Sequence, residues 1–152
     1  MNMKKHLLLL LMILLCAAQV VCAQEAYVVP SDGGTTVTFY YDSQKATRGG
    51  SALSDYVVDR FLSGDITKLI IDDTFADYKP SSMSTWFFNW SKLTTIVGIE
   101  NLNTEKVTTM KSMFQNCTAL TTLDLTSFNT EKVTDMEGMF AYCSALTSVD
   151  LA

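Results

Sequence analysis

Residues 102–125 and 128–151 repeat one pattern of hydrophobic and polar positions. The hexapeptide Asn-Thr-Glu-Lys-Val-Thr occurs twice, 26 positions apart, and 15 of the 24 aligned positions are identical. A weaker copy covers 78–99, where the apolar positions match at an offset of 27 and one extra residue falls near Val97 and Gly98. Because self-similarity at a fixed period is the mark of repeat architectures, we predict one degenerate and two regular repeat units.

Each regular unit contains two kinds of hydrophobic spacing. Residues 120–125 (Leu-Thr-Thr-Leu-Asp-Leu) alternate apolar and polar side chains, which predicts a strand. From Val107 to Cys117 the apolar residues fall at i, i+3, i+6, i+7 and i+10, which predicts a short helix, and Thr134 with Glu137 forms a capping-box pattern for the equivalent helix. We therefore expect an α/β repeat solenoid over residues 66–152, with a strand plus a short helix in each unit and matching apolar side chains stacked in its core.

The N-terminal part of the chain predicts a separate cap for this stack. Residues 26–29 and 35–41 are strand-forming, and the turn residues between them predict a β-hairpin. The spacing in 53–63 predicts a short helix, and 66–73 is the expected first strand of the array. We expect residues 24–65 to cover the end of the array; the alternative, an independent ligand domain, would have a thin core for its size.

No matching C-terminal cap is visible after the last repeat strand. The sequence stops at Ala152, directly after Asp150 and Leu151. An uncovered repeat leaves apolar side chains and unpaired strand edges in water. Three explanations stay open: a naturally short product, a shortened version of a longer array, or another molecule that covers this face. End-to-end self-association at this face is one prediction.

The first residues have the layout of a secretory signal peptide. Lys4 and Lys5 precede an apolar run from 7 to 18, and Val21-Cys22-Ala23 offers a cleavage site after Ala23. The apolar run is shorter than the ~20 residues that a membrane-spanning helix needs. We expect residues 1–23 to be removed, and the mature chain to be secreted or held at a bacterial cell surface without a membrane span.

Charge and residue content narrow the function. Loss of Lys4 and Lys5 leaves 16 acidic residues against 9 basic ones, which disfavours nucleic acid and anionic membranes as partners. The single histidine, His6, lies in the predicted signal peptide. Without it the chain cannot build Ser-His-Asp or Cys-His catalysis or a His-ligated zinc site, and no cofactor is expected.

The repeat resembles the leucine-rich repeats of BspA-like bacterial surface proteins. The motif F-N-T-x-x-V-T-x-M-x-x-M-F-x-x-C-x-x-L-T-x-L-D-L carries the resemblance over residues 75–152, and 27–50 looks like the region that often precedes such repeats. The resemblance implies an exported or surface-displayed binding protein, with adhesion to host glycoproteins as the usual proposal. The family motif fixes no ligand-binding residues.

The residues between the strand leucines form the candidate binding face. In leucine-rich repeats such residues face solvent, and here they carry hydroxyls and carboxylates suited to protein or glycan contacts. A merely solvated sheet is the alternative. Asp124 and Asp150 together fall short of the 6–8 oxygens that calcium prefers. The candidates are Thr94, Thr95, Thr121, Thr122, Asp124, Thr147, Ser148 and Asp150.

Cys117 and Cys143 occupy the same place in neighbouring units. An oxidising compartment and the close spacing of units would permit a disulfide between them. The weaker copy has Trp90 at this place, so the position selects a buried apolar group. Two buried thiols are therefore favoured over a disulfide.

Methionines and aromatic residues recur in register along the units. They could line an apolar ligand groove, but their spacing favours core packing. The aromatic residues of the degenerate copy are expected to seal the cap against the stack. The residues concerned are Met83, Met110 and Met136, Phe87, Phe114 and Phe140, and Trp86, Phe88 and Trp90.

The sequence thus favours an exported, non-enzymatic binding module that contacts an extracellular protein or glycoprotein. A structural spacer without its own ligand is the main alternative. A glycan-acting enzyme using Asp72 and Asp73 is a remote one, because neighbouring strand residues point to opposite faces and cannot flank one bond.

Overall fold

The computed structural model describes residues 23–54 and 65–151, and all structural statements below concern these residues. The predicted signal peptide, apart from Ala23, and most of the predicted 53–63 helix lie outside them. The elements are β1 (Glu25–Ser31), η1 (Asp32–Gly34), β2 (Thr36–Asp42), α2 (Lys45–Arg48), β3 (Ser51–Ala52), β4 (Lys68–Ile71), η3 (Asp73–Asp77), β5 (Thr95–Val97), η4 (Ile99–Asn101), β6 (Thr122–Leu125) and β7 (Ser148–Leu151).

The predicted N-terminal hairpin is present. Strands β1 and β2 pair antiparallel, with Tyr27 opposite Tyr40 and Ser31 opposite Thr36. Gly33 and Gly34 close the turn with positive φ angles of 67° and 91°, which side chains disfavour. The β-branched and aromatic residues on both sides suit a half-buried pleated surface.

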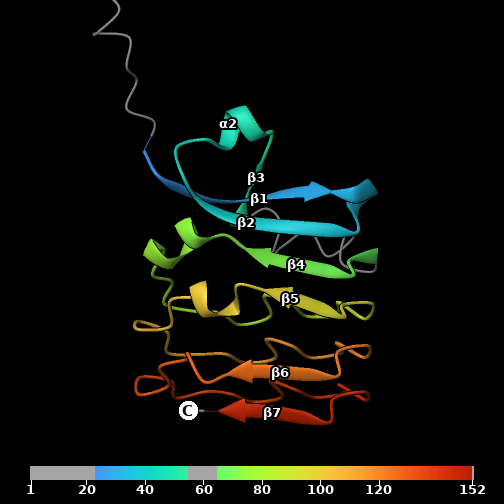
Figure 1. Ribbon diagram of the computed structural model, residues 1–152. Coiled ribbons are helices and arrows are strands. Elements are labelled where there is room, and N and C mark those ends of the chain that lie inside the picture. Colours follow the sequence, from blue (N-terminus) through green and yellow to red (C-terminus); the bar gives the residue numbers. More distant parts are fainter. Residues whose placement is uncertain (1–22, 55–64, 152) are drawn as a thin grey trace, which may run out of the picture.

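The strands form two sheets that follow one another down the molecule (Figure 1). In the five-stranded sheet the order is β3-β1-β2-β4-β5, with β2, β4 and β5 mutually parallel. Strands β6 and β7 form a separate parallel pair. The hairpin thus continues directly into the sheet that β4 and β5 extend.

The prediction of an α/β leucine-rich-repeat solenoid is wrong. The described residues form a five-stranded mixed sheet and a separate parallel pair, and their only α-helix is the four-residue α2. Residues 107–117 and 133–143 form successive turns rather than helices. The capping box fails with them, since the Glu137 side chain pairs with Lys111 of the preceding unit.

Left-handed residues prevent the helices. Ser112 and Asn116 have φ angles of 55° and 64°, and the equivalent Gly138 and Tyr142 have 64° and 61°. An α-helix of L-residues cannot contain such a conformation every four residues. A chain of tight turns, however, returns apolar side chains to one side at intervals of three and four, as a helix does. The hydrophobic spacing therefore fitted both structures.

The backbone amides of these turns bond to the next unit. Met110, Phe114 and Asn116 donate to carbonyl oxygens of Asp135, Met139 and Ala141, at N···O distances of 2.8, 2.9 and 2.9 Å. In a helix they would donate four residues back along their own segment. These hydrogen bonds between units give the backbone N–H groups their acceptors. They also join each layer, meaning one repeat unit with its strand, to the next layer.

The core runs between the strands and the turns. Phenylalanine rings from successive units pack against each other, with centroid distances of 5.1 Å between Phe87 and Phe114 and 6.0 Å between Phe114 and Phe140. Met83 and Met110 are fully buried, and Trp86 packs against Phe39 of β2. These residues therefore pack the interior. Met136, at 43% exposure, is the exception.

Candidate binding surface

All eight side chains of the predicted binding face are exposed. Thr95 lies on β5, Thr122 and Asp124 on β6, and Ser148 and Asp150 on β7. Thr94, Thr121 and Thr147 are the residues immediately before these strands. The alternation within β6 explains the arrangement, because Leu123 and Leu125 face the core and leave Thr122 and Asp124 in solvent.

Strand register aligns part of this polar face in rows. Thr122 lies opposite Ser148, and Asp124 lies opposite Asp150. The Asp124 carboxylate accepts hydrogen bonds from the Thr126 hydroxyl at 2.7 Å and from the Thr126 N–H at 3.0 Å. These bonds lower the pKa of Asp124, so it remains an anion in this row at neutral pH.

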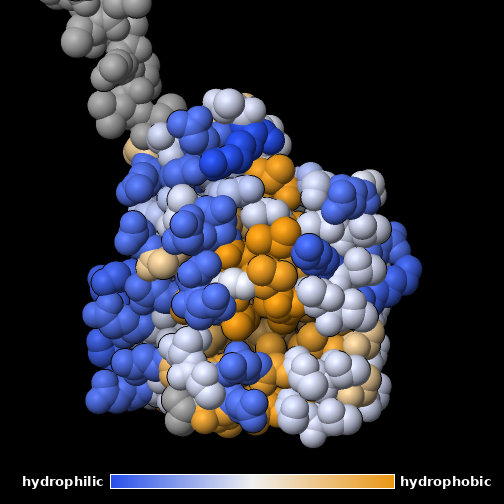
Figure 2. Space-filling view, viewed as in Figure 1, coloured by the Kyte–Doolittle hydropathy of each residue, from blue (hydrophilic) through white to orange (hydrophobic). Residues whose placement is uncertain are grey.

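The other half of the same face is apolar, which the sequence did not reveal. The register places Val29, Thr38, Ile70 and Val97 in one row across β1, β2, β4 and β5. Val97 is 46% exposed. Figure 2 shows a band of apolar surface in the middle of this view, bordered by hydrophilic side chains. Only the pairing of the hairpin with β4 brings these residues together.

A polar pocket of about 320 Å³ lies where the chain leaves β5 and β6. The strands end at Val97 and Leu125, and the following loops supply the walls. Its lining is dominated by amides, hydroxyls and carboxylates, from Ala76, Glu100, Asn101, Leu102, Asn103, Thr104, Glu105, Ser127 and Asn129.

Two side chains of this lining, Asn103 and Thr104, also form hydrogen bonds with backbone groups. The Asn103 side chain donates to the Ala76 carbonyl at 2.9 Å and accepts from the Glu105 N–H, and Thr104 accepts from the Asn129 N–H at 2.7 Å. In the sequence, the repeated Asn-Thr-Glu indicates the period of the repeat. The recurrence of this tripeptide also indicates polar side chains at equivalent loops of successive units. The pocket itself could be located only from the geometry of those loops.

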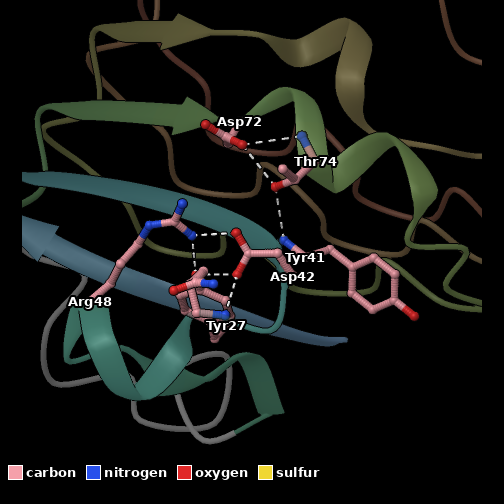
Figure 3. A network of polar contacts seen from close by, with 7 residues as sticks. Tyr27, Tyr41, Asp42, Arg48, Asp72 and Thr74 are labelled. Carbon is pink, nitrogen blue, oxygen red and sulfur yellow. Dashed lines mark hydrogen bonds and ion pairs between the residues drawn. The ribbon is translucent and has the colours of Figure 1, made fainter. Parts of the chain in front are cut away.

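A polar network joins the hairpin to α2 (Figure 3). The Tyr27 hydroxyl donates to Asp42 at 2.7 Å, and the Arg48 guanidinium donates to both Asp42 and Tyr27. Arg48 also lies over the Tyr40 ring, 4.1 Å from its centroid. The network fixes α2 on the outer side of the hairpin.

Ionisation within this network follows from burial and hydrogen bonding. Burial, together with the hydrogen bond to Asp42, raises the pKa of Tyr27 to about 12. Burial also raises the pKa of Asp42, but hydrogen bonds from Tyr27, Arg48 and the Gln44 N–H outweigh it and lower the pKa on balance. Tyr27 is therefore a neutral donor and Asp42 an anion at neutral pH.

The acid pair Asp72 and Asp73 does not form a catalytic arrangement. Asp72 caps η3 by accepting from the Thr74 N–H at 3.1 Å and from the Thr74 hydroxyl at 2.8 Å. That hydroxyl in turn accepts from the Tyr41 N–H, as Figure 3 shows. Asp73 is exposed. Asp72 thus serves to join the hairpin to the layer below.

Cys117 and Cys143 are free thiols. Each donates to the carbonyl of a phenylalanine in the preceding unit, with Sγ···O distances of 3.2 Å from Cys117 to Phe87 and 3.0 Å from Cys143 to Phe114. Burial raises the pKa of Cys117 to about 12 and also raises that of Cys143. Neither is a thiolate at neutral pH.

Within residues 23–54 and 65–151, no three His, Cys, Asp or Glu side chains are grouped so that they could hold a metal ion. No helix there has the length and apolarity required to cross a membrane.

Comparisons with known proteins give one match. Residues 73–151, more than half of the chain, match the model of a family described as "Mycoplasma protein of unknown function, DUF285". No curated protein and no solved structure matches significantly. The family match begins within η3 and covers all the repeat units. The resemblance to BspA-like surface proteins stays a prediction.

Proposed function

Because the chain belongs to the DUF285 family, whose function is open, we propose from its geometry that it is an exported, non-enzymatic binding module. It contacts an extracellular protein or glycoprotein through the polar strand face formed by the eight residues defined above. Export rests on the predicted signal peptide at 1–23.

The observation that supports this proposal is the uniform exposure of the eight side chains, which lie on or immediately before β5, β6 and β7. A row of hydroxyls next to a row of carboxylates can donate and accept hydrogen bonds at regular intervals. The strands that carry them are held by a core in which Leu123 and Leu125 are nearly fully buried. Polar groups on rigid strands lose little freedom when a partner binds, which favours recognition.

The test is a binding screen with a matched pair of variants. The secreted chain is applied to arrays of extracellular-matrix proteins and of glycans, and any bound target is titrated. The face variant combines Thr121→Ala, Thr122→Ala and Asp124→Ala. The control variant changes Lys106→Ala and Lys132→Ala, two exposed residues outside the face. Loss of the Asp124 carboxylate also removes its bonds to Thr126, so circular dichroism of both variants accompanies the titration.

We expect saturable binding that the face variant lowers by about tenfold or more, since two or three hydrogen bonds are removed, and that the control variant retains. Equal loss in both variants argues against the strand face. Silence across both arrays favours the structural spacer.

A further inference from the structure

A single backbone link recurs where each layer of chain enters its strand. Thr67 donates to the Thr35 carbonyl, Thr94 to the Thr67 carbonyl and Thr147 to the Thr121 carbonyl, with N···O distances of 2.8, 3.0 and 2.9 Å. In every case the threonine hydroxyl donates to the same oxygen, at 3.3, 3.2 and 3.0 Å. The link joins neighbouring layers at the strand side.

One member of this series is missing. Thr121 is the equivalent residue of the next layer, and the matching acceptor is the Thr94 carbonyl. Within the described residues, neither the Thr121 N–H nor its hydroxyl donates a hydrogen bond to Thr94, and Thr121 takes part only as the acceptor for Thr147. Strands β5 and β6, which follow these residues, likewise do not pair with each other. Each pairs on its other side, β5 with β4 and β6 with β7.

The same two layers remain joined on the opposite side of the core. Met83, Thr85 and Phe87 donate to carbonyl oxygens of Thr109, Lys111 and Met113, at N···O distances of 3.0, 3.0 and 2.9 Å. Within the described residues, backbone hydrogen bonds between these two units are therefore absent where the units carry strands. Figure 2 shows a hollow in the surface at about this level, with apolar atoms in its floor.

The extra residue of the degenerate unit falls at the end of β5, next to the opening. At Gly98 the chain turns with a φ angle of 78°, and it approaches β4 so closely that a Cβ there would lie 2.2 Å from the Ile71 carbonyl oxygen. The Asn101 side chain donates to that same oxygen at 2.9 Å. The segment after β5 is thus held at the end of β4, and η4 within it also lies against β6.

We propose that the opening between β5 and β6 is a slot for an extended peptide, which enters as an additional parallel strand. The occupant would offer a carbonyl to the Thr121 N–H and a backbone N–H to the Thr94 carbonyl. It would thereby join β4–β5 to β6–β7 in one continuous parallel ladder, extending the pairing that already exists on both sides. A strand between two others needs its neighbours at about twice the ~4.8 Å spacing of paired strands.

The walls of the slot define the chemistry of the peptide. Alternate side chains of an inserted strand point inward, toward the level of Ile96 on β5 and Leu123 on β6, both of which contribute to the core. The remaining side chains point outward beside Thr95 and Thr122, which are exposed. The expected ligand is a segment of alternating apolar and polar residues without proline. This inference uses backbone groups, so it does not depend on the polar-face proposal.

The first test is residue-resolved amide hydrogen exchange on the free chain. The Thr94 and Thr147 amides, which are hydrogen-bonded to the preceding layer, should exchange slowly, whereas the Thr121 amide should exchange near the rate of an unstructured peptide. If Thr121 is protected as well as Thr94 and Thr147 are, the slot does not exist.

The second test adds a probe peptide, Ala-Leu-Thr-Ser-Val-Asp-Leu, which copies residues 145–151. Binding is followed by fluorescence anisotropy and by repeating the exchange measurement. We expect saturable binding, slowed exchange at Thr121 and unchanged exchange at Thr147. A peptide with three internal N-methyl groups should bind at least about tenfold more weakly, because it lacks ladder donors.

Two outcomes overturn the proposal at this stage. The first is an unmodified peptide that does not bind or leaves Thr121 exchange unchanged. The second is an N-methylated or scrambled peptide that binds equally well. Because the face variant keeps its backbone amides, it should still take up the peptide. Failure of the slot and failure of the polar face are therefore distinguishable.

Discussion

At the scale of single residues, the sign of φ decides the structure of the repeat. Each regular unit places two left-handed residues four positions apart, and the chain fills these positions with serine, asparagine, glycine and tyrosine. Asparagine and glycine tolerate this conformation, but serine and tyrosine do so at a cost. The spacing of hydrophobic residues does not depend on the sign of φ. For this reason the pattern predicted helices where the structure has turns.

The first prediction tests this residue-level constraint. Gly138→Ala should lower the free energy of unfolding by about 1 kcal/mol, because φ is 64° there. Packing is not the cause, since the nearest atom to an added Cβ is Ser112 Oγ, 3.5 Å away. Ser112→Gly, at the equivalent position, should remain within about 0.5 kcal/mol of the parent. Urea denaturation measures both, and an undiminished stability for Gly138→Ala would contradict the left-handed turn.

The second prediction concerns pH and Tyr27. Its pKa is about 12 in the folded chain but about 10 in an unfolded one, so between these values the unfolded state loses the proton first. The stability associated with neutral Tyr27 is complete below pH 10 and is lost as pH rises toward 12. Urea midpoints measured from pH 9 to 11.5 should fall, and less steeply in Tyr27→Phe. If the urea midpoints of the parent and of Tyr27→Phe fall equally with pH, the pKa of Tyr27 is not raised in the folded chain.

At the scale of elements, layers are held by equivalent groups that repeat from one layer to the next. Just before the strands, threonine N–H and hydroxyl groups donate to carbonyl oxygens of the preceding layer. Phenylalanine rings of successive layers pack against one another in the core. The contribution of each group depends on whether another layer lies beyond it. Phe114 is fully buried between Phe87 and Phe140, whereas Phe140 is only partly buried.

The third prediction compares these two rings. Phe114→Ala should lower the free energy of unfolding by roughly 3–5 kcal/mol, the range for a large buried side chain. Phe140→Ala should cost clearly less, because part of its surface is already in water. Urea denaturation gives both values, and Phe114→Leu serves in place of Phe114→Ala if that variant does not fold. Equal losses would mean that the two rings are equally buried in solution.

At the scale of the whole molecule, the two ends differ. The hairpin, with α2 and its polar network, covers the N-terminal end of the core (Figure 1). In the last layer Met136 is 43% exposed and Leu151 is 63% exposed, while the equivalent Met110 and Leu125 are at 0% and 1%. Strand β7 also pairs on one side only.

The fourth prediction follows from this last layer. The chain of 152 residues should self-associate with rising concentration, because association removes apolar surface and a free strand edge from water. Met136→Lys combined with Leu151→Lys should abolish the effect. Sedimentation velocity over a hundredfold range of concentration measures it. A monodisperse monomer of the parent chain at the highest concentration would rule it out.

The amount that could be predicted differed between parts of the fold. The hairpin at 26–29 and 35–41 was correctly predicted, since a glycine-containing turn between β-branched segments has few alternatives. Burial of Met110 and Phe114 was also correctly predicted from their recurrence. The helices were wrong, because tight turns and helices share one apolar spacing. The polar pocket at Asn103 and Asn129 and the apolar row at Ile70 and Val97 were missed, because each joins residues from separate segments.

The sequence alone determined the period of the repeat, the identity of most core side chains and the alternation that leaves Thr122 and Asp124 in solvent. These features are local, since each depends on which side chains recur within one unit. Only the tertiary structure decided that the turns bond across units, that the hairpin pairs with β4 and that the ladder is interrupted between β5 and β6. Backbone hydrogen bonds cause this difference, because any residue except proline can donate one, and its partner, 25 or more positions away, leaves no trace in the sequence.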